Sequence, residues 1–280
     1  MNTKFGLIIN NTSSDGSIPD WKIEFHQKLL NHSYIVFRNV TFDNTEEMIE
    51  FSKTIGDTVE YAFGKVLDIK NEGKGKQTQL SNRAMCIHQD SVLPDAFADI
   101  IMLYCRASPK KGGESLLCDN RKFLEILKNE DQELYDFFVN TKVKYMNHTP
   151  EYYSGDFDDN EWIIKNSMRK HGVLNIDMPY FAFNDFRDPL RNFTAIFDGL
   201  SEEQSDSYMQ RLDNIIRRED VMVEHNLEVG DLIIVDNSLV SHGRNGYPES
   251  EYRQLSRVQI EVRKSMSQRL KNNEEEELVC

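Results

Sequence analysis

The chain has 280 residues, of which 39% are hydrophobic and 29% charged, and its formal net charge is −14. This length and composition are typical of a globular protein that buries a sizeable core without disulfides. A chain so acidic repels polyanions, which excludes nucleic acids and anionic membrane surfaces as default partners. Its four cysteines form no CxxC pair, so the sequence indicates reduced thiols in a cytoplasm rather than a disulfide scaffold.

The apolar runs of the chain are short. The run from Phe5 to Ile9 is shorter than a signal-peptide core, and no small-residue cleavage site follows it. No stretch approaches the roughly 18–20 apolar residues that a membrane span needs. We therefore expect a cytoplasmic protein that has no membrane partner.

Helical and strand periodicities predict a series of elements along the chain. In chain order they are a helix at 21–31, a strand at 34–40, a capped helix at 45–56, strands at 64–70, 99–107 and 115–119, one or two helices at 120–141, a helix at 201–219, and strands at 231–237 and 253–263. Ser201 and Gln204 have the spacing of a capping box. Residues 148–171 are polar and aromatic with no clean period, which indicates a long loop over a site, and the acidic residues 264–280 are expected to form a flexible tail.

The order of these elements indicates the fold class. There is no regular βαβ alternation and no GxGxxG motif, which disfavours a doubly wound nucleotide-binding sheet. Short apolar strands flanked by helices predict a mainly β fold, either a two-sheet antiparallel sandwich or a jelly roll. Because no repeat or Pro/Ser-rich linker interrupts the chain, residues 1–280 are expected to form one domain.

Three side chains that can bind a metal stand in a suggestive pattern. His88 and Asp90 are two positions apart, so in a strand they would point to the same face. His242 ends the run GDLIIVDNSLVSH, after an apolar strand and before a glycine. Two histidines and a carboxylate hold Fe(II) on one face and leave the other positions open, as in non-haem iron oxygenases. An HxD pair alone is more often a solvated histidine beside a turn-forming aspartate, so the pair needs support from other residues.

Two arginines provide that support. Arg253 and Arg257 are four positions apart, which places both on one face of a regular strand. Two guanidinium groups that face one interior are unfavourable unless they meet an anion. A dicarboxylate co-substrate would meet that need through bidentate, charge-assisted hydrogen bonds.

The motifs HQD, GGES, GDLIIVDNSLVSHGR and YRQLSR, taken in order over roughly residues 20–263, resemble those of the TauD/TfdA family of Fe(II)/2-oxoglutarate oxygenases. The resemblance implies a double-stranded β-helix (jelly-roll) core and an iron centre made of His88, Asp90 and His242. It further implies that Arg253 and Ser115 bind the distal carboxylate of 2-oxoglutarate, and that Arg257 contacts the co-substrate or an anionic substrate group. Threonine is commoner than Ser115 in the family, and related halogenases lack the carboxylate that Asp90 provides.

The activity that the resemblance implies is the oxidation of a small, amino-acid-derived molecule by dioxygen. It would proceed by hydroxylation or desaturation, with release of succinate and CO2. Residues 57–69 and the start FGLII resemble a subgroup that oxidises amino-acid isonitriles in natural-product biosynthesis.

Several alternatives stay open. A sulfonate substrate of the taurine type would need a cationic partner, for which Arg257 is a candidate. A non-catalytic jelly-roll binding protein and a cupin-like zinc or manganese protein are further alternatives, and neither requires the ligand set and the arginines together. The sequence is also compatible with a homo-oligomer.

Overall fold

The computed structural model describes residues 4–10, 22–61, 63–73, 77–93, 97–148, 161–184 and 192–262. The predicted flexible tail at 264–280 lies outside these ranges, as does the part of the predicted loop at 149–160.

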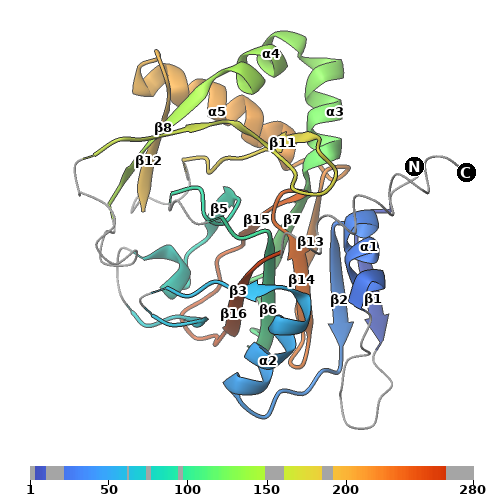
Figure 1. Cartoon of the computed structure of the whole chain (residues 1–280). Coiled ribbons are helices and arrows are strands. Elements are labelled where there is room, and N and C mark those ends of the chain that lie inside the picture. The colour runs from blue at the N-terminus through green and yellow to red at the C-terminus, as the bar shows by residue number, and fades with distance from the viewer. Residues whose placement is uncertain are drawn as a thin grey trace, which may run out of the picture.

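A large sheet forms the centre of the molecule (Figure 1). It has seven strands in the order β1-β2-β14-β6-β16-β3, with β4 also paired to β16. Its strands are β1 (Leu7–Asn10), β2 (Tyr34–Arg38), β3 (Asp57–Thr58), β4 (Val66–Lys70), β6 (Ile100–Ala107), β14 (Leu232–Asp236) and β16 (Gln254–Glu261). All its pairs are antiparallel except β1 with β2.

A smaller antiparallel sheet has four strands in the order β13-β7-β15-β5. Its strands are β5 (Met85–His88), β7 (Ser115–Asp119), β13 (Met222–His225) and β15 (Val240–Arg244). Side chains of both sheets line one pocket, among them Ile101 and Val235 of the large sheet and Leu117 of the small one. The two sheets therefore face each other across a shared interior.

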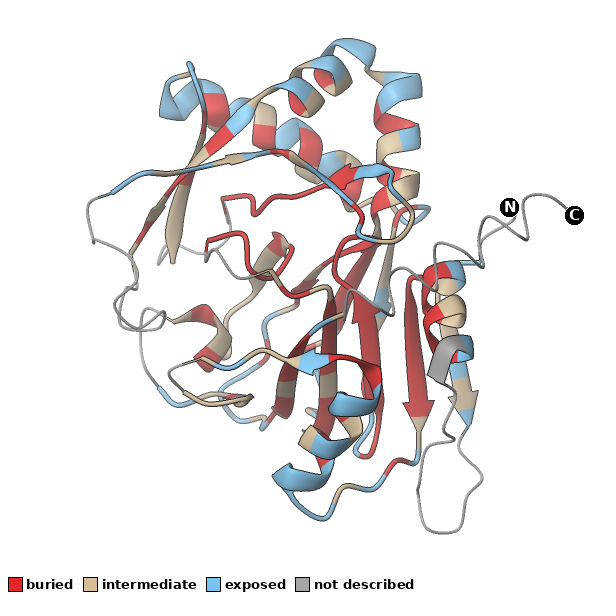
Figure 2. Cartoon of the chain, viewed as in Figure 1, coloured by how far each residue is buried: buried red, intermediate tan, exposed pale blue. Residues whose placement is uncertain are grey.

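The alternation of side chains along each strand produces four layers. In β14, Leu232 and Ile234 pack with helices α1 (Lys22–His32) and α2 (Thr45–Ile55), whereas Ile233 and Val235 belong to the interior between the sheets. Every residue of β14 is buried, and Figure 2 shows the central strands as the most buried part of the fold. A strand covered on both faces has a nearly continuous apolar run, as the first four residues of LIIVD show.

The outer face of the small sheet is covered by three helices and a third sheet. The helices α3 (Asn120–Glu130), α4 (Gln132–Asn140) and α5 (Glu202–Ile216) gather at one end of the molecule (Figure 1). The third sheet has the order β12-β8-β9 and consists of β8 (Lys142–Asn147), β9 (Ile163–Asn166) and β12 (Phe193–Phe197). These elements share one apolar core with the small sheet. The capping box of Ser201 and Gln204 is present at the start of α5, as predicted.

The predicted loop over 148–171 is wrong for its second half. Residues Ile163–Asn166 form β9, which pairs with β8, and Met168–Lys170 form β10, which pairs with β11 (Asp177–Pro179). Only Ile163 of β9 packs against the core, whereas Ile164 is 52% exposed. Such an edge strand is stabilised by pairing with a distant strand and not by its own apolar pattern. It therefore cannot be recognised from the local sequence.

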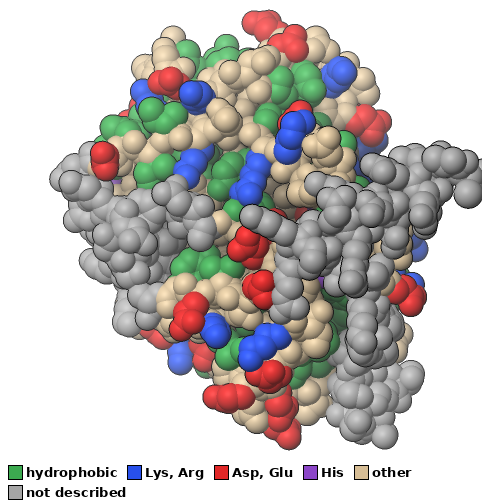
Figure 3. Space-filling view, in the orientation of Figure 1, with side chains coloured by type: hydrophobic (Ala, Val, Ile, Leu, Met, Phe, Trp, Pro, Cys, Tyr) green, Lys and Arg blue, Asp and Glu red, His purple; other side chains and the backbone are tan. Residues whose placement is uncertain are grey.

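The exposed charges and the lengths of the helices can be compared with what the sequence predicted. On the face shown in Figure 3, acidic and basic side chains lie interspersed among the residues that the structure describes. Within the same part of the chain, no helix is long and apolar enough to cross a membrane.

Candidate metal and co-substrate site

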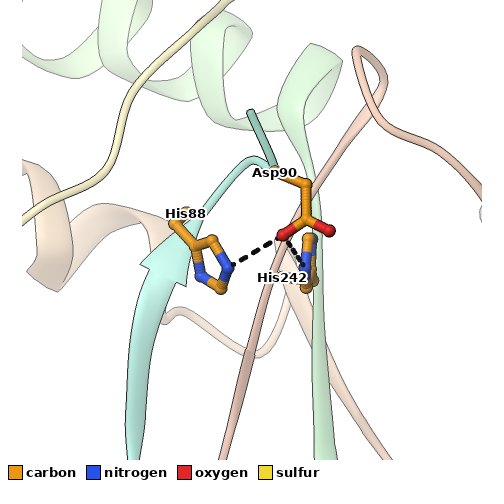
Figure 4. Close-up of side chains that lie close together, drawn as sticks. All are labelled: His88, Asp90 and His242. Carbon is orange, nitrogen blue, oxygen red and sulfur yellow. Dashed lines mark ion pairs between the residues drawn. The ribbon is translucent and has the colours of Figure 1, made fainter. Parts of the chain in front are cut away.

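Two histidines and an aspartate meet between the two sheets. His88 is the last residue of β5 and lies directly across from His242 of β15 in the strand pairing. Oδ1 of Asp90 is 3.4 Å from Nε2 of His88 and 3.6 Å from Nε2 of His242 (Figure 4). One ligand atom from each residue lies within 4.8 Å of the other two. The three side chains thus converge on a single point, as the sequence predicted.

The reason that Asp90 points there differs from the predicted one. Asp90 lies in the turn after β5 and not in the strand, so strand alternation does not determine its direction. Asn237, which follows β14, holds the turn instead. Its Oδ1 accepts from the Asp90 backbone N–H at 3.0 Å, and its Nδ2 donates to the carbonyls of Asp90 and Ala98 at 3.0 and 2.8 Å. The large sheet therefore fixes the turn that carries the carboxylate.

The protonation of the three groups suits a metal ion. Nδ1 of His88 lies 2.9 Å from the Cys86 carbonyl oxygen, so Nδ1 carries the proton and Nε2 presents a lone pair to the site. Burial, and then the neighbouring His88, lower the pKa of His242, which keeps it neutral at pH 7. Burial acts to raise the pKa of Asp90, but the charge of Arg257 and hydrogen bonds with the histidines hold it well below its usual range. Two imidazoles and one ionised carboxylate form a donor set that fits Fe(II).

The second carboxylate oxygen of Asp90 has its own partners. Nη1 of Arg257 lies 2.9 Å from Oδ2, and Nε2 of Gln259 lies 2.5 Å from the same atom. Arg257 also lines the pocket, so the predicted cationic residue is at the site. It pairs there with the carboxylate of Asp90, a contact that the sequence did not predict.

The pocket continues from the histidines to a buried arginine. Arg253 and Ser115 line it, together with apolar side chains such as Leu103, Ile233 and Leu255. Nη2 of Arg253 lies 3.4 Å from the Ser115 hydroxyl. Burial lowers the pKa of Arg253 to about 10, so the guanidinium is still charged at neutral pH.

The charge of Arg253 has no carboxylate partner within 4 Å among the residues that the structure describes. A buried cation without a counter-ion is unfavourable. The far end of this pocket is therefore suited to bind an anionic group.

A double-glycine turn joins Arg253 to Ser115. Gly112 and Gly113 both have φ of +74°, and a Cβ on Gly112 would lie 2.5 Å from the Gly246 carbonyl oxygen. The carbonyl of Gly113 accepts from Nε of Arg253 at 3.0 Å. The left-handed turn therefore positions Ser115, and its Gly113 carbonyl also holds the Nε side of the Arg253 guanidinium group.

Sequence reasoning missed three residues that hold the site, namely Asn237, Gln89 and Gln259. The side chain of Gln89, which lies between His88 and Asp90 in the sequence, donates to the Pro179 carbonyl at 2.5 Å and accepts from the Phe181 N–H at 3.0 Å. Asn237 was visible in the sequence as part of the GDLIIVDN motif. Gln259 could have been noticed as a polar residue in the apolar run VQI, two positions after Arg257.

Replacing Gly243 by alanine is expected to weaken metal binding although residue 243 is not a ligand. A Cβ at this position would lie 2.9 Å from Cδ1 of Ile87 and from the Met85 carbonyl oxygen. It would push β15 away from β5 and separate the two histidines. We expect Mn(II) affinity, measured by calorimetry, to fall by about 10-fold or more, as for other disturbances around a ligand. Gly172→Ala is the control, because a Cβ there meets nothing within 4 Å and its backbone is not in the left-handed region, and equal affinity in both variants would contradict the prediction.

Comparison with known proteins agrees with this geometry. The family model described as "Taurine catabolism dioxygenase TauD, TfdA family" matches residues 11–259. The chain belongs to this family. Membership confirms the predicted Fe(II)/2-oxoglutarate-dependent dioxygenase, which uses Fe(II), 2-oxoglutarate and dioxygen on a small-molecule substrate.

Two curated relatives match over most of their length. A 3-((Z)-2-isocyanoethenyl)-1H-indole synthase of Fischerella ambigua is 25% identical over 269 residues, which cover 92% of this chain and 93% of the relative. A tyrosine isonitrile desaturase of Erwinia amylovora is 22% identical and covers 92% of this chain and 88% of its own. The predicted sequence similarity to isonitrile-pathway enzymes is thereby confirmed.

Solved structures share the fold. PvcB of Pseudomonas aeruginosa superimposes with a TM-score of 0.70 at 18% identity and covers 92% of this chain and 87% of that one. A taurine dioxygenase of Burkholderia xenovorans that is described as putative gives a TM-score of 0.67 at 16% identity and covers 93% of this chain and 90% of its own. The predicted jelly-roll core with flanking helices is confirmed by these likenesses.

Proposed function

We propose that His88, Asp90 and His242 are the iron ligands and that Arg253 and Ser115 bind the distal carboxylate of 2-oxoglutarate. The observation that carries this assignment is the convergence of Nε2, Nε2 and Oδ1 at one end of a pocket whose other end holds the charge of Arg253. When bound, iron and 2-oxoglutarate supply the oxidising power, as one oxygen atom of O2 enters succinate and CO2 is released. Arg253 would orient the co-substrate by a charge-assisted pair with its carboxylate.

The surrounding side chains of the chain exclude water from this reaction. The stretch of pocket between the arginine and the histidines is lined by apolar residues, including Ile101, Leu103, Leu117, Ile233 and Val235. In such surroundings the electrostatic pairing of Arg253 is stronger than in water. Arg257 lies beside the ligands, where it neutralises the charge of Asp90.

For the substrate, we propose a small amino-acid-derived isonitrile that loses two hydrogens to become a vinyl isonitrile. The support is that both relatives that match nearly end to end are enzymes named for isonitrile products or substrates. A taurine-like sulfonate is less well supported, because the cation that it would need at the metal, Arg257, is already paired with Asp90. We also place the enzyme in the cytoplasm, supported by the free thiols of Cys86, Cys105 and Cys118.

The substrate proposal is tested by turnover. Protein loaded with Fe(II) and 2-oxoglutarate is incubated in air with the isonitrile of tyrosine, with the isonitrile of tryptophan, or with taurine. We expect succinate to form in step with an isonitrile product that has lost two hydrogens, and taurine to leave succinate at its background level. Succinate formed with taurine and not with either isonitrile would contradict the proposal, and a product that has gained one oxygen would replace desaturation by hydroxylation.

A further inference from the structure

The two oxygens of the Asp90 carboxylate have different surroundings. Oδ1 faces Nε2 of both His88 and His242, whereas Oδ2 receives hydrogen bonds from Arg257 and Gln259. Asp90 itself is only 5% exposed, so its carboxylate has little contact with bulk solvent. The carboxylate is therefore held in one rotation, with one oxygen directed to the metal point and the other turned away from it.

Gln259 is an unusual residue for its place in the fold. It is 5% exposed in β16, between Val258 and Ile260, which are both fully buried on the opposite face of the strand. Because an ionised carboxylate only accepts hydrogen bonds, the amide must turn its NH2 group to Asp90. Its Oε1 is then buried and has no hydrogen-bond partner among the described residues. An amide in such a place is unfavourable for packing alone, and Asp90 is the one described group to which it donates.

We propose that Gln259 is a positioning residue that limits Asp90 to binding the metal through one oxygen. This inference rests on the proposed function of His88, Asp90 and His242 as ligands. A carboxylate free to rotate can offer both oxygens to an ion, as carboxylates do with other metals. The second oxygen would then fill a coordination position that 2-oxoglutarate or dioxygen needs. Arg257 neutralises the charge of Oδ2, while Gln259 fixes the direction of the carboxylate.

The test is Gln259→Met, which keeps the length of the side chain and removes the donor. The chain provides a matched control in Gln254→Met, because Gln254 lies in the same strand and its Nε2 also donates to a carboxylate, that of Asp68, at 3.2 Å on the surface. Metal-free wild type and variants are titrated with Mn(II) alone by calorimetry, and then with 2-oxoglutarate on the Mn(II)-loaded protein. Circular dichroism verifies that each variant is folded.

We expect Gln259→Met to lower the affinity for 2-oxoglutarate on the Mn(II) protein by about 10-fold or more, within the range of outer-shell effects at metal sites. Gln254→Met should bind both ligands as the wild type does. If Gln259→Met fails to fold, Gln259→Asn is used, since it retains an amide that ends one carbon short, and the same loss is expected.

Two other results would overturn the inference in different ways. Equal affinities of wild type and Gln259→Met for Mn(II) and 2-oxoglutarate would show that the amide does not position the carboxylate. Wild-type protein that binds no Mn(II), or binds it as well after His242→Ala, would instead remove the metal site itself.

Discussion

His242→Ala is expected to abolish turnover and to weaken Fe(II) and Mn(II) binding by more than about 100-fold, since changes to outer-shell partners alone reach 10–100-fold. As a ligand, His242 would supply one of three donors, since its Nε2 is directed to the same point as Nε2 of His88 and Oδ1 of Asp90. Anaerobic titration with Mn(II) measures the binding, and succinate release in air measures the turnover.

The matched control for His242→Ala is His225→Ala. His225 lies in β13, on the other side of β7 from β15, so both substitutions affect a neighbour of the same strand. His225 is not part of the cluster of possible ligands. We expect this variant to bind metal as the wild type does. Retention of full Mn(II) affinity by His242→Ala, with normal folding, would show that His242 is not a ligand.

Arg253→Met should weaken the binding of 2-oxoglutarate by roughly 10- to 150-fold, corresponding to about 1.5–3 kcal/mol for hydrogen bonds to a charged group. The metal affinity should not change, because Arg253 contacts none of the three ligands; its described partners are Gly113 and Ser115. Arg253→Lys should lie between the wild type and methionine, since an ammonium does not reproduce a bidentate fork. The measurement is a calorimetric titration of the Mn(II)-loaded protein with 2-oxoglutarate.

A second readout separates binding from folding in this prediction. The Arg253 cation is buried and has no carboxylate partner among the described residues, so its replacement by methionine should leave the melting temperature of the ligand-free protein unchanged or raise it. Arg106→Met is the control, because Arg106 also donates to a serine hydroxyl, that of Ser256, at 2.7 Å, but does not line the pocket. A normal 2-oxoglutarate affinity in Arg253→Met would contradict the assignment.

Much of the site could be predicted because its residues stand out in the sequence. Two histidines, an aspartate and two arginines in apolar surroundings are chemically unusual, and their order matched a family pattern. The direction of Asp90 could not be predicted, since Asn237 fixes it from a position 147 residues away. The partner of Arg257 was missed for the same reason, because strand periodicity gives the face of a side chain and not the group that it meets.

In the fold, too, some elements could be predicted from the sequence and others could not. Strands such as β6 and β14, which are buried on both faces, have long apolar runs that identify them. The sheet of β8, β9 and β12 was missed because these strands have mixed patterns and are paired over long sequence distances. Local propensity is too weak to identify such strands before their partners are known.

The position of β5 at the rim of the small sheet affects how easily the protein opens there. β15 is the one named strand that pairs with β5 among the described residues, and its register is irregular between His242 and Arg244. On the other edge of β5, His88 forms an isolated bridge with Ala182. An ion held by His88 and His242 would act as a cross-link that closes the intervening chain and reduces the entropy gained on opening. Protein without metal should therefore open more readily at this rim than protein that holds the ion.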